Sequence, residues 1–152
     1  MKHLLWLLLT LPPILVAAVL VQNRAPLFSE PGPWQRLGVY LGSNVAQTSP
    51  THAHPELRTP WFASEPQTLR PLVLVAMQSL RWRAIREQDG VIHAEVVTPI
   101  MRFVDDVSVR FETRDGRTAL HLRSASRVGR ADFAANQLHL QRLLAALPAS
   151  VR

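Results

Sequence analysis

The chain opens with an apolar run over residues 4–21, in which Thr10 is the only polar residue. As an α-helix, this run would extend for about 27 Å, close to the ~30 Å thickness of the hydrocarbon core of a bilayer. Lys2 precedes the run, which favours a cytoplasmic amino terminus. Residues 1–23 are therefore predicted to be a single-pass transmembrane anchor in the inner (cytoplasmic) membrane, with the remainder on the periplasmic or extracytoplasmic side. A signal peptide cleaved after Ala18 is the alternative.

Residues 24–66 show no sustained apolar period and are rich in proline. The absence of a period and the abundance of proline predict a Pro-rich extended arm and no helix. Trp34, Tyr40, Trp61 and Phe62 give the arm apolar surface. Part of the arm is therefore expected to wrap the folded domain.

Residues 67–150 carry the pattern of a folded domain. Pro71, with apolar positions continuing to Leu80, predicts a helix that begins near Thr68. In residues 132–147, apolar side chains recur at spacings of three and four, which predicts a second helix with Asp132 as its N-cap.

Between these helices, two pairs of strand-like runs each flank an Asp-Gly dipeptide, a sequence typical of two-residue hairpin turns. The pairs are residues 81–87 with 91–98 around Asp89-Gly90, and residues 102–113 with 118–126 around Asp115-Gly116. The predicted fold class is therefore α+β. It has an antiparallel four-stranded meander of two hairpins, with an N-terminal and a C-terminal helix packed on one face.

The turn at residues 115–116 fixes the partners along the second hairpin. In this register Val107 and Val109 face the core, and Asp105 lies opposite Ser126 at the edge of the core. Because a buried carboxylate without partners is strongly unfavourable, Asp105 must find hydrogen-bond donors. The candidate donors are Ser124, Ser126, a backbone N–H near Gly129, and Asn136.

Asp106 points to the opposite face, with Arg123 and Arg127 as its diagonal neighbours. The open end of the hairpin thus gathers a polar cluster beside the last helix. The candidate ligand-binding residues are Asp105, Asp106, Arg123, Ser124, Ser126, Arg127, Asp132 and Asn136. Arginines in such a cluster can grip a carboxylate, a phosphate or a lipid headgroup. The other interpretation is a structural network that fixes the helix to the sheet.

The composition of the chain limits which partners, metals and cofactors are expected. The formal net charge is +6, but the 17 cationic residues are scattered and form no basic run, so no nucleic-acid partner is predicted. The absence of cysteine excludes disulfides and thiolate metal sites. His52, His54 and Glu56 have no convincing further ligand in the arm, so neither a metal nor a cofactor is predicted.

The hairpin motifs resemble those of a known family. "RFVDDV" at residues 102–107, "LRSASRVG" at 122–129, Asp132 and Asn136 look like the signature of domain-of-unknown-function family 1499, which occurs in bacteria and plastids. The likeness extends over roughly residues 38–147. Where relatives often have a cysteine in a "PNCVSS"-like stretch, this chain has Val45. The resemblance implies an exported or membrane-anchored protein and implies no established activity.

A catalytic triad of Ser124, His121 and Asp105 is not expected, because His121 falls on the opposite face of the hairpin. No catalytic residue is therefore predicted. The expected function is that of a membrane-anchored, non-catalytic envelope protein that binds a small anionic or lipidic ligand, or a protein partner. The alternatives are a hydrolase-type enzyme that uses the same cluster, and a purely structural envelope protein.

Overall fold

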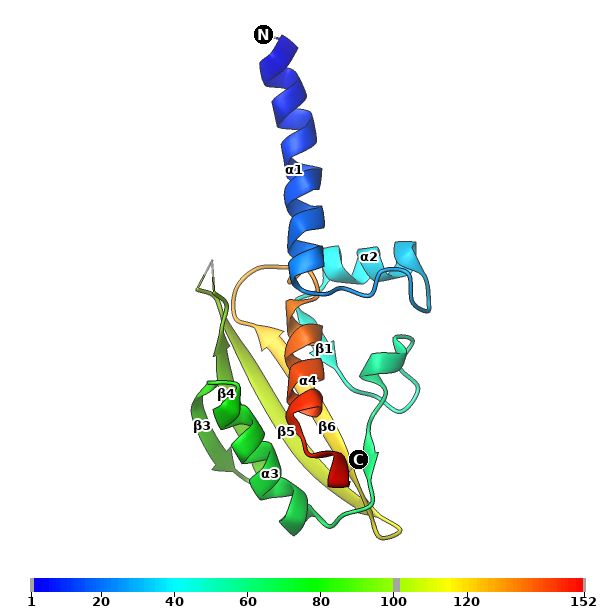
Figure 1. Ribbon diagram of the computed structural model, residues 1–152, viewed down its shortest axis with the longest axis vertical. Coiled ribbons are helices and arrows are strands. Elements are labelled where there is room, and N and C mark those ends of the chain that lie inside the picture. The colour runs from blue at the N-terminus through cyan, green and yellow to red at the C-terminus, as the bar shows by residue number, and fades with distance from the viewer. Residues whose placement is uncertain (1, 100–101, 152) are drawn as a thin grey trace.

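The computed structural model describes residues 2–99 and 102–151, with side chains from residue 9 onward (Figure 1). An antiparallel sheet forms its centre, and two helices lie in front of one face of that sheet. The predicted α+β class is confirmed. The helices on this face are α3 (Pro66–Ser79) and α4 (Ala135–Ala146), close to the predicted bounds.

The sheet has six strands, so the predicted number of four is wrong. Its strands are β1 (Val45–Gln47), β2 (Trp61–Phe62), β3 (Arg83–Gln88), β4 (Val91–Val97), β5 (Val104–Arg114) and β6 (Arg117–Ser126). The order is β1-β6-β5-β4-β3, and β2 also pairs with β6. The two additional strands come from the Pro-rich arm and satisfy backbone groups along the otherwise free edge of β6.

Both predicted hairpins are confirmed. The central residues of each turn have positive φ, with 52° and 77° at Asp89 and Gly90 and 53° and 71° at Asp115 and Gly116. This backbone matches the twist of the flanking strands. The second hairpin has the predicted register, which pairs Asp105 with Ser126. In the first hairpin, the β3–β4 pairing shifts register between Arg83 and Arg86.

The core lies between the sheet and the two helices. Its centre is formed by side chains that are at most 1% exposed: Leu69, Val73 and Met77 of α3, Leu140 and Leu143 of α4, and Ile92, Val107, Val109, Leu120 and Leu122 of the sheet. The inward-facing residues of β5 and β6 are therefore those that the hairpin register predicts.

The segment over residues 24–66 is not wholly extended, and the prediction that it contains no helix is wrong. It forms α2 (Pro33–Gly42) and a short 3₁₀ turn, η1 (Pro55–Leu57). Pro33 occupies the first turn of α2, where its missing N–H leaves no hydrogen bond unmade. Tyr40 and Phe62 are buried as expected, whereas Trp34 is exposed.

The amino-terminal helix α1 (Lys2–Gln22) projects from one end of the domain (Figure 1). Its last turns pack on the body, where Leu20 lies in an apolar cluster with Tyr40 and Ala134. Asn23 donates a hydrogen bond to the backbone carbonyl of Phe133. A transmembrane helix was predicted here. Among the residues that the structure describes, no helix is long and apolar enough to cross a membrane.

Candidate functional site

The predicted eight-residue cluster is divided between the two faces of the sheet. On the inner face, Asn136 is fully buried and joins three segments. Its Nδ2 donates to the Asn44 carbonyl at 2.8 Å and to Ser126 Oγ at 2.9 Å, while its Oδ1 accepts from Ser124 Oγ at 2.5 Å. The polar groups of Ser124, Ser126 and Asn136 therefore satisfy one another.

Asp132 caps α4 from two residues upstream of the N-cap position, Ala134. Its carboxylate accepts hydrogen bonds from the backbone N–H groups of Ala134 and Asn136, both at 3.0 Å. Burial raises the pKa of Asp132, and these hydrogen bonds act in the opposite direction. The prediction that Asp132 is the N-cap residue is therefore wrong, because the helix begins later than expected, but its carboxylate still accepts hydrogen bonds from backbone N–H groups at the start of α4.

Asp105 is fully buried and pairs with His139 on α4. Its Oδ2 lies 2.9 Å from His139 Nε2, and its Oδ1 has no hydrogen-bond partner among the described residues. The prediction that Asp105 uses serine, asparagine or backbone donors is wrong, because Ser124, Ser126 and Asn136 are occupied with each other. His139 is therefore the partner of a buried acid.

On the outer face, Asp106 pairs with Arg127 as predicted. Arg127 Nε and Nη2 donate to the two carboxylate oxygens of Asp106 at 2.9 and 2.7 Å, and Nη2 also reaches Glu95 at 2.5 Å. The hydrogen bonds from Arg127 lower the pKa of Asp106. Arg123 lies across from Ser108 and contributes to this pKa shift through longer-range attraction. The positive charge of Arg127 is therefore already balanced by the carboxylates of Asp106 and Glu95.

A second arrangement, which the sequence analysis missed, lies at the end of α3. There, a hollow of about 270 Å³ is bordered by Arg81, Arg83, Arg102 and Arg142. None of its described lining residues is acidic. None of these four guanidinium groups makes a hydrogen bond or an ion pair with a described residue. We call this feature the arginine-lined hollow.

Apolar side chains and one histidine also line the arginine-lined hollow. Leu80, Trp82 and Val96 line it, and His139 borders it. The rings of Trp82 and His139 meet edge to face with centroids 6.5 Å apart. Because His139 also holds Asp105, the buried acid is connected to the hollow through one imidazole.

Arg81 is held at the hollow by the end of α3. Its N–H bonds to the Gln78 carbonyl at 2.9 Å, and the N–H of Trp82 bonds to the Met77 carbonyl at 3.0 Å. These two bonds form a Schellman motif, in which the residue at the Arg81 position takes a left-handed conformation and is usually glycine. Arg81 adopts a φ of 58°, and Arg102 adopts 56°.

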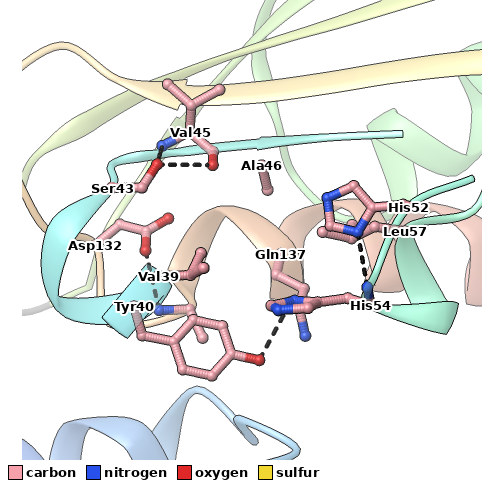
Figure 2. Close-up of a pocket in the computed structure, with 11 residues that line it drawn as sticks. Val39, Tyr40, Ser43, Val45, Ala46, His52, His54, Leu57, Asp132 and Gln137 are labelled. Atoms are coloured by element: carbon pink, nitrogen blue, oxygen red, sulfur yellow. Dashed lines mark hydrogen bonds between the residues drawn. The ribbon is translucent and has the colours of Figure 1, made fainter. Parts of the chain in front are cut away.

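A smaller cavity of about 40 Å³ lies beneath α2 and is lined by Tyr40, His52, His54 and Gln137 (Figure 2). Gln137 Oε1 lies 3.3 Å from both Tyr40 Oη and His54 Nδ1. Burial lowers the pKa of His54. This volume suits one or two water molecules. Among the described residues, no group of three or more His, Asp or Glu side chains is placed to hold a metal ion.

The fold and these sites define an α+β domain with a six-stranded antiparallel sheet, a buried polar network and a cationic hollow. A family model described as "Protein of unknown function (DUF1499)" matches residues 36–147, so the chain belongs to this family and the resemblance in the hairpin is confirmed. Comparison with curated proteins and with solved structures finds no match.

Proposed function

We propose that the protein is a non-catalytic binding domain for a small anionic ligand, which it holds in the arginine-lined hollow. The observation that carries this proposal is the gathering of Arg81, Arg83, Arg102 and Arg142 around one hollow whose described lining has no acidic residue. Four uncompensated cations in one place repel each other, and an anion relieves that repulsion.

The size of the hollow limits the ligand. Its volume of about 270 Å³ lies just below the ~300–1,000 Å³ range of sites for drug-sized molecules. A phosphate or carboxylate group with a few attached atoms suits this space better than a nucleotide. Guanidinium groups bind both anions through paired hydrogen bonds. A soluble phosphate ester and a phospholipid headgroup share this chemistry.

The backbone of Arg81 also supports the proposal. A left-handed conformation costs a residue other than glycine roughly 1–2 kcal/mol. Arginine does not have the short polar side chain that lets asparagine tolerate this conformation. Its presence where glycine would be more stable is explained if the side chain serves a ligand.

The proposal includes membrane attachment through residues 4–21 at the inner (cytoplasmic) membrane, with the domain on the extracytoplasmic side. The exposed apolar side chains of α1, among them Leu9, Ile14 and Leu15, support attachment. Alkaline extraction of membranes from cells that produce the full chain tests it, together with protease treatment of intact spheroplasts. The chain is expected to remain with the membranes and to be digested from outside.

Calorimetric titration of the full chain in a nonionic detergent tests the anion site. Glycerol 3-phosphate serves as the soluble probe and phosphatidylglycerol in mixed micelles as the lipid probe. Arg142→Gln should weaken binding by about tenfold or more, because it removes one charge-assisted contact. Arg110→Gln is the matched control, since Arg110 is exposed on β5 and lies outside the hollow.

Arg81→Gly is a more specific variant, because it should lower the affinity for the anion while raising the stability of the fold. Binding should weaken, while the free energy of unfolding should rise by about 1 kcal/mol as the left-handed strain disappears. Equal loss of binding in Arg110→Gln would mean that overall charge attracts the probe, and the proposed site would be wrong. A preference for one probe identifies the source of the anion.

A hydrolase is the second candidate, and the Asp105–His139 pair at the edge of the hollow is the observation that favours it. A histidine oriented by a buried carboxylate is a common general base. Hydrolysis of a soluble phosphate ester by the wild-type protein, abolished in His139→Gln with binding retained, would establish this function instead.

A further inference from the structure

Large apolar side chains are exposed at the end of the body from which α1 projects. The segment over residues 23–32, α2, the residues just before β5 and the β6–α4 connection all lie at this end (Figure 1). Phe28 and Trp34 are 91% and 83% exposed, and Phe103 and Val128 are 40% and 60% exposed. We call these four residues the α1-end surface.

The helix α1, which projects from this same end, also carries exposed apolar side chains (Figure 1). Within α1, Leu9, Ile14 and Leu15 are 62%, 61% and 56% exposed. Exposed large apolar groups from several separate segments mark an interaction surface. Phenylalanine and especially tryptophan are well suited to the interfacial layer of a membrane, where their amphipathic or apolar rings meet headgroups and acyl chains.

The charges at this end favour an anionic surface. Arg24, Arg102 and Arg130 are exposed there, and Glu30 is the exposed acidic residue of the same segments. Asp132, in the same connection as Arg130, is turned inward as the cap of α4. The resulting excess of positive charge suits anionic phospholipid headgroups.

We propose that the α1-end surface rests on an anionic phospholipid bilayer, with Phe28, Trp34, Phe103 and Val128 at the level of the headgroups. This inference rests on the proposed attachment of residues 4–21 to the membrane, and it adds that the folded body contacts the bilayer directly. With α1 directed into the lipid, the end that carries these residues faces the membrane plane (Figure 1).

Site-directed fluorescence on the full chain tests the inference, because the sequence contains no cysteine and a single cysteine can be labelled cleanly. Three single variants are labelled with an environment-sensitive fluorophore: Ile14→Cys on α1, Val128→Cys on the α1-end surface, and Val75→Cys on α3. Val75 is the matched control, since it is the same residue type and is also 60% exposed. The labelled proteins are reconstituted in vesicles of phosphatidylcholine with phosphatidylglycerol that carry a nitroxide lipid, with the nitroxide on the headgroup for positions 75 and 128 and on the acyl chain for position 14, which lies near the middle of the span over residues 4–21.

The inference expects loss of emission by nitroxide quenching at positions 14 and 128 and unchanged emission at position 75. It also expects weaker quenching at position 128 in vesicles of phosphatidylcholine alone. Quenching at position 14 without quenching at 128 would overturn docking of the body while supporting attachment. If neither position is quenched, both proposals fail. A spectral change at position 128 that follows protein density, without quenching by the lipid, would identify a second copy as the occupant and overturn the inference.

Discussion

The pairing of Arg36 with Glu56 allows a quantitative prediction about how the arm is held to the domain. Arg36 on α2 is fully buried, and its guanidinium contacts both carboxylate oxygens of Glu56, at 2.5 and 3.0 Å. It also donates to Tyr40 Oη at 2.9 Å and to the backbone carbonyls of Ser29 and Glu30. One side chain therefore joins α2, the segment before it, and the turn at residues 55–57.

Glu56→Gln removes the negative charge and retains a side chain of nearly the same shape. Removing one partner of a buried ion pair costs about 3–5 kcal/mol. The Glu56 side chain keeps 20% of its surface exposed, so water screens part of the lost attraction, and glutamine still offers one acceptor. We therefore expect the free energy of unfolding to fall by about 2–3 kcal/mol.

This loss should depend on pH. Burial raises the pKa of Glu56, but the hydrogen bonds and charge of Arg36 outweigh it, and the net pKa lies below the ordinary value of 4.5. An acid with a lowered pKa in the folded state stabilises the protein above its unfolded-state pKa. This contribution is lost as the pH falls through the folded-state pKa. The difference between wild type and Glu56→Gln should therefore be full at pH 6 and shrink below about pH 4.

Urea denaturation of the full chain in nonionic detergent, followed by far-ultraviolet circular dichroism, measures these free energies at each pH. A double-mutant cycle with Arg36→Met isolates the pair, because the double variant should be little worse than Arg36→Met alone. A difference below about 0.5 kcal/mol at pH 6, or additive effects in the cycle, would refute the reasoning that the charge pair fixes the arm.

Asn136→Ala should lower the free energy of unfolding by about 2–4 kcal/mol, because it leaves the buried hydroxyl of Ser124 without its acceptor. Urea denaturation measures this, and a near-neutral result would show that the inner network is dispensable. In the same assay, Asp106→Asn should cost less than about 1 kcal/mol, because the pair with Arg127 is half exposed. Gly116→Ala should cost about 1 kcal/mol from its φ of 71° alone, since an added Cβ meets no atom within 4 Å. Gly38→Ala within α2 also meets nothing within 4 Å and should instead raise the melting temperature, so equal effects at the two glycines would contradict this explanation.

The sequence predicted the second hairpin residue by residue, because the features that determine this hairpin lie within its own turn and strands. Asp115-Gly116 fixes the turn, and the alternation of apolar and polar residues fixes which face each side chain takes. The same local logic fails for β1 and β2. Strands of three and two residues are too short to show a period, and they form because β6 offers them an edge.

The Asp105–His139 pair could have been found from the sequence. The register turns Asp105 toward the last helix, and His139 lies three residues after Asn136, which places both on one side of that helix. The arginine-lined hollow could not be found in this way. Its four arginines come from the turn after α3, the start of β3, the residues just before β5, and α4, spread from residue 81 to residue 142. With arginine scattered throughout the chain, only the tertiary fold shows which four meet.

The strand β3 forms the outer edge of the sheet, opposite the edge that the arm covers. A bare edge of this kind can recruit a strand from another molecule and start aggregation. Here the edge is six residues long, carries Arg83, Arg86 and Glu87, and is interrupted by the shift in register. Its charges and its irregular pairing make β3 a poor template for cross-β growth. The protein can therefore keep this edge strand unpaired at high local concentration.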